Sequence, residues 1–179
     1  MGRLSGKVAF VTGAAMGNGK GGAEAYAKHG AHVVLADISP VLADTEKEFK
    51  EKGYSVSTCQ FDVRDGAAAK SAADAVVAQY GKIDILLNNA GVAKLQPFHE
   101  MNDELRDFHI DINIKGVWNV AKAIYPHMMA AKYGRIVNMS LSLIHIWCIN
   151  AVHDHTGYCF HPIITFAASL TLNEALTCR

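Results

Sequence analysis

The sequence predicts an α/β fold with a doubly wound parallel sheet. Short apolar runs alternate with helix-compatible runs over residues 1–140, which requires crossovers and places helices on both faces of the sheet. A glycine-rich turn at residues 12–19 joins the first apolar run to the first helical run. Polar residues follow several of the apolar runs, and in such sheets ligands bind at the carboxyl ends of the strands. Together these observations indicate a Rossmann-like sheet.

The elements are expected in regular alternation. Buried or half-buried strands are predicted at residues 7–11, 32–37, 55–61, 83–87 and 135–139. Helices are predicted at residues 19–29, 40–52, 64–80 and 102–133, with Gly53 and Gly81 as stops for the second and third. The fourth helix is expected to be a single long one, although it contains Gly116 and Pro126. The sheet is expected to stop after about five strands.

The glycine-rich turn is a candidate diphosphate site. Glycine lets the backbone turn sharply and approach a ligand, and the following helix offers free N–H groups and a partial positive charge. The alternative for this motif alone is an ordinary tight turn between a strand and a helix. The cofactor-binding residues expected here are Gly13, Met16, Gly17, Asn18 and Gly19.

Asp37 ends the second predicted strand, 18 residues after Gly19. A carboxylate at this position can bind both hydroxyls of an adenosine ribose and would repel a 2′-phosphate. Neither the glycine turn nor Ile38 supplies a basic residue for such a phosphate. We therefore expect NAD rather than NADP, with Asp37 and Ile38 at the site; a solvated aspartate at a strand end is the alternative.

Polar and small residues also follow the third and fourth predicted strands. Asp62 and Val63 close the third strand, where the carboxylate could meet the adenine amino group. Asn89, Ala90 and Gly91 follow the fourth strand; their small size would let the cofactor pass close to the backbone, and amides there can tie strands together. Asn113 falls inside a predicted helix, where asparagine is mildly unfavourable. It is either functional or simply faces solvent.

Taken together, residues 5–140 resemble the short-chain dehydrogenase/reductase family. The resemblance rests on six elements in order, which are the turn at 12–19, Asp37, Asp62–Val63, the run at 88–91, Asn113 and the run at 134–140. It implies an NAD-binding domain and interconversion of an alcohol and a carbonyl by hydride transfer. It also implies cofactor contact at Ser140 and a catalytic role for Asn113, which would hold a water. Asn18 departs from the family, which usually has an aliphatic residue there.

The resemblance ends after Ser140. The family's catalytic serine position holds Leu141, Asp154 stands where its tyrosine is expected, and no lysine follows Lys132. The Tyr-x-x-x-Lys pair is therefore absent. Residues 141–179 contain three charged residues against 31 in residues 1–140, and are interpreted as an aberrant tail produced by a splice, a frameshift or a library artefact.

These observations leave three hypotheses for function. They are an NAD-dependent oxidoreductase acting on a secondary alcohol or carbonyl, a dinucleotide-binding fragment without turnover, and a metal-binding or interaction protein. The third would use the tail residues Cys148, His153, His155, Cys159 and His161, whose spacing matches no usual zinc pattern, so no metal site is expected. The substrate is not revealed, although the resemblance makes the loop at 92–97 a determinant of specificity.

Composition excludes several other classes of function. Lysine plus arginine equals aspartate plus glutamate at 17 each, which argues against a nucleic-acid partner. No apolar run reaches the length of a membrane span, and no signal peptide is recognisable, so a cytoplasmic protein is expected. The resemblance makes a homo-oligomer through the helix at 102–133 an expectation. Its apolar residues are Leu105, Phe108, Ile112 and Val120, and most of them are expected to pack on their own sheet.

Overall fold

The computed structural model describes residues 2–94, 96–139 and 169–171. The strands are β1 (Val8–Thr12), β2 (His32–Asp37), β3 (Val56–Gln60), β4 (Ile85–Asn88), β5 (Arg135–Asn138) and β6 (Ser169–Thr171). The helices are α1 (Gly17–Lys28), α2 (Leu42–Glu51), α3 (Gly66–Tyr80), η1 (Phe98–Glu100), α4 (Asp103–Ile110), η2 (Asp111–Gly116) and α5 (Val117–Ala130). The predicted alternation of strands and helices is confirmed, with boundaries shifted by a few residues.

The sheet has the order β3-β2-β1-β4-β5-β6. Strands β1 to β5 are parallel, with β1 between β2 and β4, so that the chain reverses direction across the sheet after β3. The parallel part of the sheet ends after five strands, as predicted, and β6 covers its edge by pairing antiparallel with β5, Ile136 opposite Leu170. This strand comes from the tail, in which the sequence pattern indicated no strand of the family.

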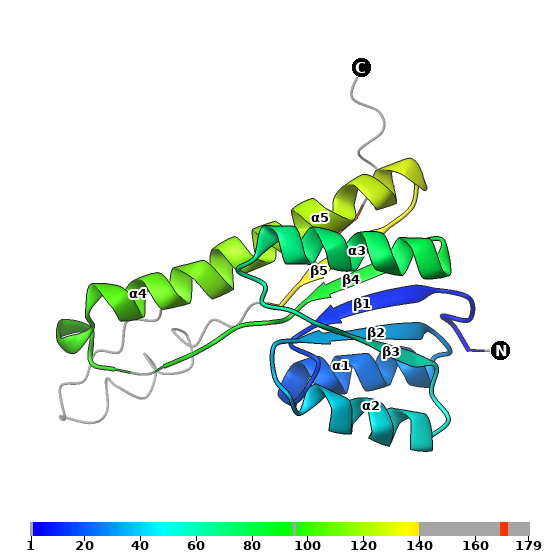
Figure 1. The fold of residues 1–179 in the computed structure, drawn as a ribbon, viewed down its shortest axis with the longest axis horizontal. Helices are drawn as coiled ribbons and strands as arrows, with labels where there is room; N and C mark the ends of the chain where they lie inside the picture. Colours follow the sequence, from blue (N-terminus) through cyan, green and yellow to red (C-terminus); the bar gives the residue numbers. More distant parts are fainter. Residues whose placement is uncertain (1, 95, 140–168, 172–179) are drawn as a thin grey trace, which may run out of the picture.

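Alternation along the strands divides the core into two layers. Phe10 and Leu86 face α3 and α5, whereas Val11 and Leu87 face α1 and α2. Small side chains such as Ala73 and Ala23 let these helices approach the sheet closely. Figure 1 shows α3 and α5 on one side of the sheet and α1 and α2 on the other. The predicted doubly wound arrangement is confirmed.

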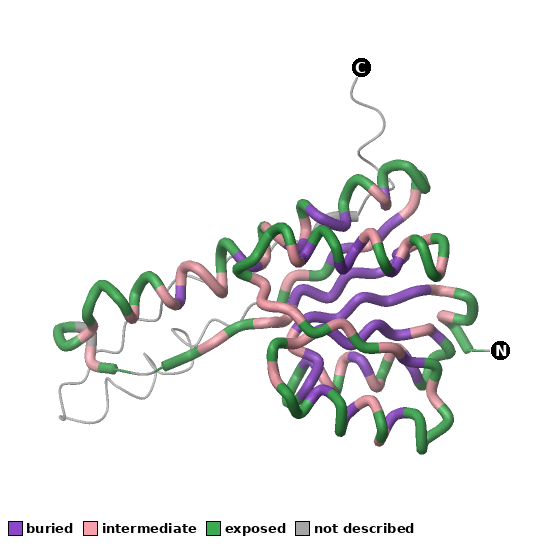
Figure 2. Tube along the Cα trace, in the orientation of Figure 1, coloured by how far each residue is buried: buried purple, intermediate pink, exposed green. Residues whose placement is uncertain are grey.

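The long helix predicted at residues 102–133 is not a uniform α-helix. It begins at Asp103, after Asn102 caps the N–H of Leu105 at 2.9 Å, and contains the π-helical segment η2 before α5. Pro126 lies inside α5 without ending it. A π segment inserts an extra residue into the helix and is frequent at functional sites. Here α4 and η2 project beyond the sheet, and α4 is largely exposed (Figure 2).

Within the described residues, no helix combines the length and apolar character needed to cross a membrane. The same residues contain no group of three or more potential metal ligands. The histidines and cysteines of the tail that were considered for metal binding lie outside the described residues.

Candidate functional site

One cavity of about 570 Å³ opens at the carboxyl ends of β1, β2 and β4. Ten of the expected cofactor-binding residues line it, namely Gly13, Met16, Asn18, Asp37, Ile38, Asp62, Val63, Asn89, Ala90 and Gly91. Residues that are as far apart as positions 13 and 91 in the sequence therefore share one surface. Their individual roles toward a cofactor remain predictions.

The glycine turn is packed tightly on one side and open on the other. A Cβ placed on Gly19 would overlap the carbonyl oxygen of Gly13, so α1 can approach the turn this closely only with glycine there. Gly17 has a positive φ of 59° and open space where its Cβ would lie. Gly17 and Gly19 are not among the residues lining the cavity; they shape the turn that borders it.

The N-terminus of α1 lacks a side-chain cap within the described part of the chain. Its cap residue, Met16, is extended and offers no side-chain hydrogen bond, and the first turn contains no acidic residue. In contrast, Asp65 accepts from the N–H groups of Ala67 and Ala68 at the start of α3. The first N–H groups of a helix need an acceptor, and an anion at this end is also favoured by the helix dipole. The start of α1 therefore suits an anionic group of a ligand.

Asp37 lies beside the glycine turn, at the end of β2. Its Oδ2 accepts a hydrogen bond from the N–H of Ala15 at 3.0 Å, and its Oδ1 accepts from the N–H of Ser39 at 2.9 Å. Each carboxylate oxygen has a second lone pair. The carboxylate is thus held by the backbone at the cavity wall and can still accept from ligand hydroxyls.

Asp62 does not stand alone in the cavity. Its carboxylate accepts from the backbone N–H and the Nε–H of Arg64, at 2.9 and 2.8 Å, and this neighbouring guanidinium lowers the pKa of Asp62. Asn119 of α5 in turn donates to the carbonyl oxygens of Val63 and Arg64, both at 3.0 Å. The predicted contact of Asp62 with an adenine amino group would have to share the carboxylate with Arg64.

The asparagines at the end of β4, Asn88 and Asn89, connect elements, as the sequence suggested. Asn89 Nδ2 donates to the carbonyl oxygen of Thr12 at 3.1 Å, and Thr12 Oγ1 accepts from the N–H groups of Asn89 and Ala90 at 3.0 Å. Asn88 Nδ2 donates to Asn138 Oδ1 at 3.0 Å. The glycine turn is therefore fixed against β4, and β4 against β5.

Asn113 lies in η2 and holds the loop that follows β4. Its Oδ1 accepts from the N–H of Val92 at 2.8 Å, and its Nδ2 donates to the carbonyl oxygen of Val92 at 2.9 Å. The alternative that Asn113 simply faces solvent is therefore wrong. Val92 lines the cavity although Asn113 does not, so the contribution of Asn113 to the site runs through the loop backbone.

The cavity is also lined by residues that were not among the predicted cofactor contacts, namely Ala36, Phe61, Arg64, Val92, Phe108 and Ile112. Ala36 and Phe61 lie at strand ends, and Arg64 follows Val63. Their positions in the sequence could therefore have predicted that they lie at the cavity. Phe108 and Ile112 line the cavity because the long helix extends past the sheet; of its four apolar residues, Val120 packs in the sheet's core. Ser140 lies outside the described residues.

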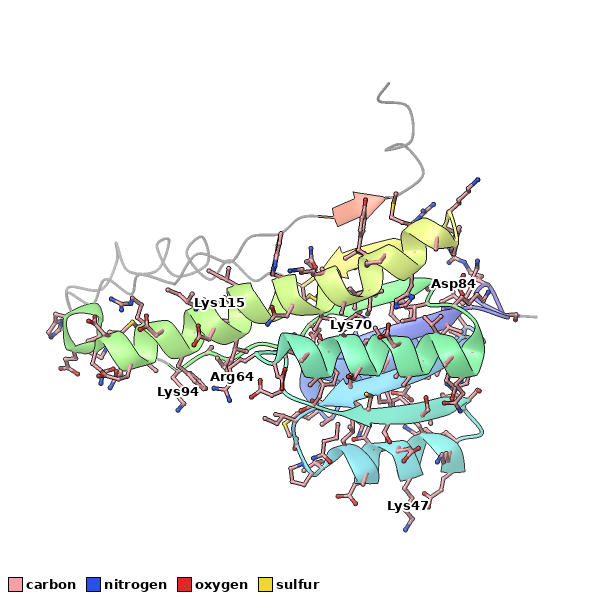
Figure 3. The ribbon with its side chains drawn as sticks, turned by 45° about the horizontal axis from the view of Figure 1, so that its top comes forward. Lys47, Arg64, Lys70, Asp84, Lys94 and Lys115 are labelled. Carbon is pink, nitrogen blue, oxygen red and sulfur yellow. The ribbon has the colours of Figure 1, made fainter. Side chains whose placement is uncertain are left out.

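Charged side chains are distributed unevenly around the sheet. Figure 3 shows Arg64 and Lys94 at the end of the sheet where the cavity opens, and Asp84 at the opposite end. Asp84 is buried and pairs with Lys7 at 3.1 Å and Lys82 at 3.0 Å. It accepts from the backbone N–H of Val8 as well, so this cluster fastens the starts of β1 and β4 and lies away from the cavity.

The sheet order, the glycine turn and the cavity at the strand ends define a Rossmann-type α/β protein. The sequence profile of the family described as "short chain dehydrogenase" matches residues 7–144. The chain belongs to this family.

Among its relatives is Oxidoreductase UcpA of Escherichia coli (strain K12), which is 51% identical over 140 residues covering 78% of this chain and 53% of that protein. The carveol dehydrogenase of Mycobacterium avium in complex with NAD is 39% identical, with a TM-score of 0.73 over 78% of this chain and 56% of that one. The gluconate 5-dehydrogenase of Burkholderia cenocepacia J2315 in complex with NADP and tartrate is 34% identical, with a TM-score of 0.72 over 76% of this chain and 54% of that one. This chain therefore spans about half the length of these relatives.

Proposed function

We propose that this protein is an NAD-dependent oxidoreductase that interconverts a secondary alcohol and a carbonyl, and that the chain as written binds the cofactor without turning it over. The observation that carries the proposal is the pairing of two features on one cavity. Asp37, a carboxylate suited to ribose hydroxyls, lines this cavity beside the glycine turn, and Met16 and Asn18 at the start of α1, which has no side-chain cap from Met16, line it as well. A dinucleotide has a ribose and a diphosphate that match these two features.

The residues fit the cofactor in the following way. The N–H groups at the start of α1, with Asn18, would bind the diphosphate, and Asp37 would bind the adenosine ribose. Asp62 and Val63 would border the adenine, and Asn89, Ala90 and Gly91 the part of the cofactor nearer the nicotinamide. Bound NAD supplies a hydride acceptor, and the protein's own task is to orient it and to exclude water.

The charges around the cavity support NAD over NADP. Among the described residues that line the cavity, Arg64 is the one basic side chain, and it is paired with Asp62. Lys20, in the first turns of α1, pairs instead with Glu48 at 2.6 Å. The 2′-phosphate of NADP would therefore be repelled by the carboxylate of Asp37, and the basic side chains named here are already paired with other carboxylates.

The missing catalytic pair supports binding without turnover. The resemblance assigns proton transfer to a tyrosine beside a lysine, and the sequence has neither in the Tyr-x-x-x-Lys arrangement. Asn113, proposed as a catalytic residue, positions the loop at Val92 but offers no acid or base. Ser140 is proposed as a cofactor contact on the resemblance alone.

Two measurements test the proposal. Titration of the chain with NADH, followed by cofactor fluorescence, should show saturable binding, and NADPH should bind at least tenfold more weakly. Incubation with NAD and a panel of secondary alcohols should give no NADH above the rate of a protein-free control. Absence of saturable NADH binding would contradict the proposed cofactor site. Clear formation of NADH from any alcohol would contradict the proposal that the chain does not turn over.

The partners proposed for the protein are a small alcohol or carbonyl and a second copy of the chain, in the cytoplasm. An exposed apolar stripe supports the second copy. Ile114, Trp118, Tyr125 and Met129 recur at helical spacing, and Trp118 is 67% exposed. Light scattering of the purified chain and of Trp118→Lys should show a dimer and a monomer, respectively. A wild-type chain that is monomeric at all concentrations would contradict this.

A further inference from the structure

The loop after β4 is held to the long helix by two side chains that lie one turn apart. Asn113 binds the N–H and the carbonyl oxygen of Val92, and His109 Nε2 accepts a hydrogen bond from the N–H of Lys94 at 3.0 Å. The alternate residues Val92 and Lys94 thus turn their backbone toward the helix. Because Val92 lines the cavity, whatever holds this loop also shapes the cavity wall.

The hydrogen bonds of His109 define its protonation state. His109 is the buried residue of α4, at 3% exposure, and its Nδ1 lies 2.7 Å from the carbonyl oxygen of Leu105. A carbonyl oxygen can only accept, so Nδ1 carries the proton. Nε2 must then be unprotonated, because it accepts from the N–H of Lys94. Both contacts are satisfied by one tautomer of the neutral imidazole.

A protonated His109 cannot make the same contacts. An imidazolium has two donors and no acceptor, so its Nε2–H would face the N–H of Lys94. Two donors facing each other lose the hydrogen bond. The bond between helix and loop therefore exists only while the ring is neutral.

The charged groups around the ring do not compensate for the added proton. The ammonium group of Lys94, in the loop, lies 4.7 Å from the ring centroid of Phe108. Phe108 directly precedes His109 in the sequence. On α4, Arg106 pairs with Asp103 and Asp107, and on η1 His99 pairs with Glu100. No carboxylate within the described part of the chain forms a hydrogen bond or ion pair with His109.

We propose that His109 is a positioning residue that holds the loop at residues 92–94 against the long helix at neutral pH and releases it in acid. The change in the loop is a property of the chain without cofactor. Its further consequence, a weaker affinity for NAD in acid, rests on the function proposed above.

The primary test is hydrogen exchange of the Lys94 amide in the chain without cofactor, measured by NMR at pH 7.5 and 5.5 and corrected for the intrinsic rate. Loss of one hydrogen bond should lower its protection about tenfold at pH 5.5. The Leu105 amide, which is capped by Asn102 Oδ1 at 2.9 Å, is the internal control and should keep its protection. Equal protection of Lys94 at both pH values would overturn the proposal, as would a protonated Nε2 in the imidazole nitrogen spectrum at pH 7.5.

Two variants separate the acceptor from the charge. His109→Gln keeps an acceptor that does not titrate, so protection of Lys94 should be the same at both pH values. His109→Phe has no acceptor, so Lys94 should be unprotected at both while Leu105 stays protected. A pH response that survives in His109→Gln would assign the effect to another group and contradict the proposal.

The consequence for the cofactor is measured separately by calorimetric titration with NAD at both pH values. Affinity should fall several-fold in acid for the wild-type chain and should not change for His109→Gln. If the chain binds no NAD at either pH, the proposed function fails, while the exchange of Lys94 still decides the role of His109.

Discussion

The carboxylate of Asp37 and the backbone N–H of Ala15 form a hydrogen bond of 3.0 Å that connects the end of β2 to the glycine turn. The residue proposed to bind the ribose therefore also holds the turn proposed to bind the diphosphate. Thr45 Oγ1, from α2, donates to the carbonyl oxygen of Ala15 at 2.8 Å and holds the same residue by its second backbone group. The proposed ribose site and the proposed diphosphate site are therefore connected directly by hydrogen bonds.

Asp37→Asn should weaken NADH binding by about tenfold to a hundredfold, because hydrogen bonds to a charged acceptor contribute about 1.5–3 kcal/mol. The amide oxygen can keep one of the two backbone contacts, so the fold should survive. NADH titration gives the affinity. The discrimination against NADPH should shrink in the same variant, since the charge that repels a 2′-phosphate is gone.

Asp44→Asn is the matched control for this substitution. Asp44 is an exposed residue in the first turn of α2 and does not line the cavity. Its NADH affinity should equal that of the wild-type chain. Equal losses in both variants would mean that net charge, and not Asp37, controls binding.

Gly19→Ala and Gly21→Ala should change stability in opposite directions. A Cβ on Gly19 would overlap the carbonyl oxygen of Gly13, so we expect a loss of about 2–4 kcal/mol in the free energy of unfolding and loss of NADH binding. Gly21 lies in the same helix with open space around its Cβ position, so alanine should add about 0.5–1 kcal/mol through helix propensity. Urea denaturation measures both, and a stable Gly19→Ala chain would contradict the close packing of the turn.

His32 should make the fold less stable in acid. Its ring stacks on Tyr80 with centroids 4.1 Å apart and hydrogen-bonds to the hydroxyls of Ser55 and Ser57, and burial lowers its pKa. With the folded pKa below the unfolded one, near 6.5, the unfolded chain binds the proton more tightly. The stabilisation is therefore complete above about pH 6.5 and is lost as the pH falls through the folded value.

His32→Gln should remove this part of the pH dependence. We expect the difference in Tm between pH 7.5 and 5.5 to be smaller in this variant than in the wild-type chain. His29, an exposed histidine three residues earlier, provides the control variant His29→Gln, which should keep the wild-type pH dependence. If His29→Gln flattens the profile as much as His32→Gln, burial of His32 is not the cause.

Asn113→Ala should free the loop at Val92. The variant leaves both backbone groups of Val92 without their side-chain partner, at a cost of about 1–3 kcal/mol. Exchange of the Val92 amide should rise at least tenfold. Ile114→Ala, which changes an exposed neighbour in η2, should leave that amide protected. Unchanged protection in Asn113→Ala would show that the loop is held without this side chain.

Local patterns in the sequence predicted the order and type of the main elements because these patterns have local causes. Five short apolar runs, bounded by turn residues, favour strands that are buried in a sheet, and Val11 and Leu35 are indeed buried. The glycines at 13, 17 and 19 mark a turn with positive φ or close contact, and Asp37 comes at the end of a run of buried residues. From such spacing we could also expect that residues 13, 37, 62 and 89–91 share one edge of the sheet.

Contacts between segments far apart in the chain could not be predicted in this way. Nothing in the residues near Val63 shows that Asn119 donates to its carbonyl oxygen, and nothing near Asn113 shows that Val92 takes both ends of its amide. The pairing of β6 with β5 likewise depends on how distant backbones meet. His109 is the clearest case. Its sequence position marks it only as a histidine in a helix, and its protonation state follows from a loop residue, Lys94, that folding brings against the ring.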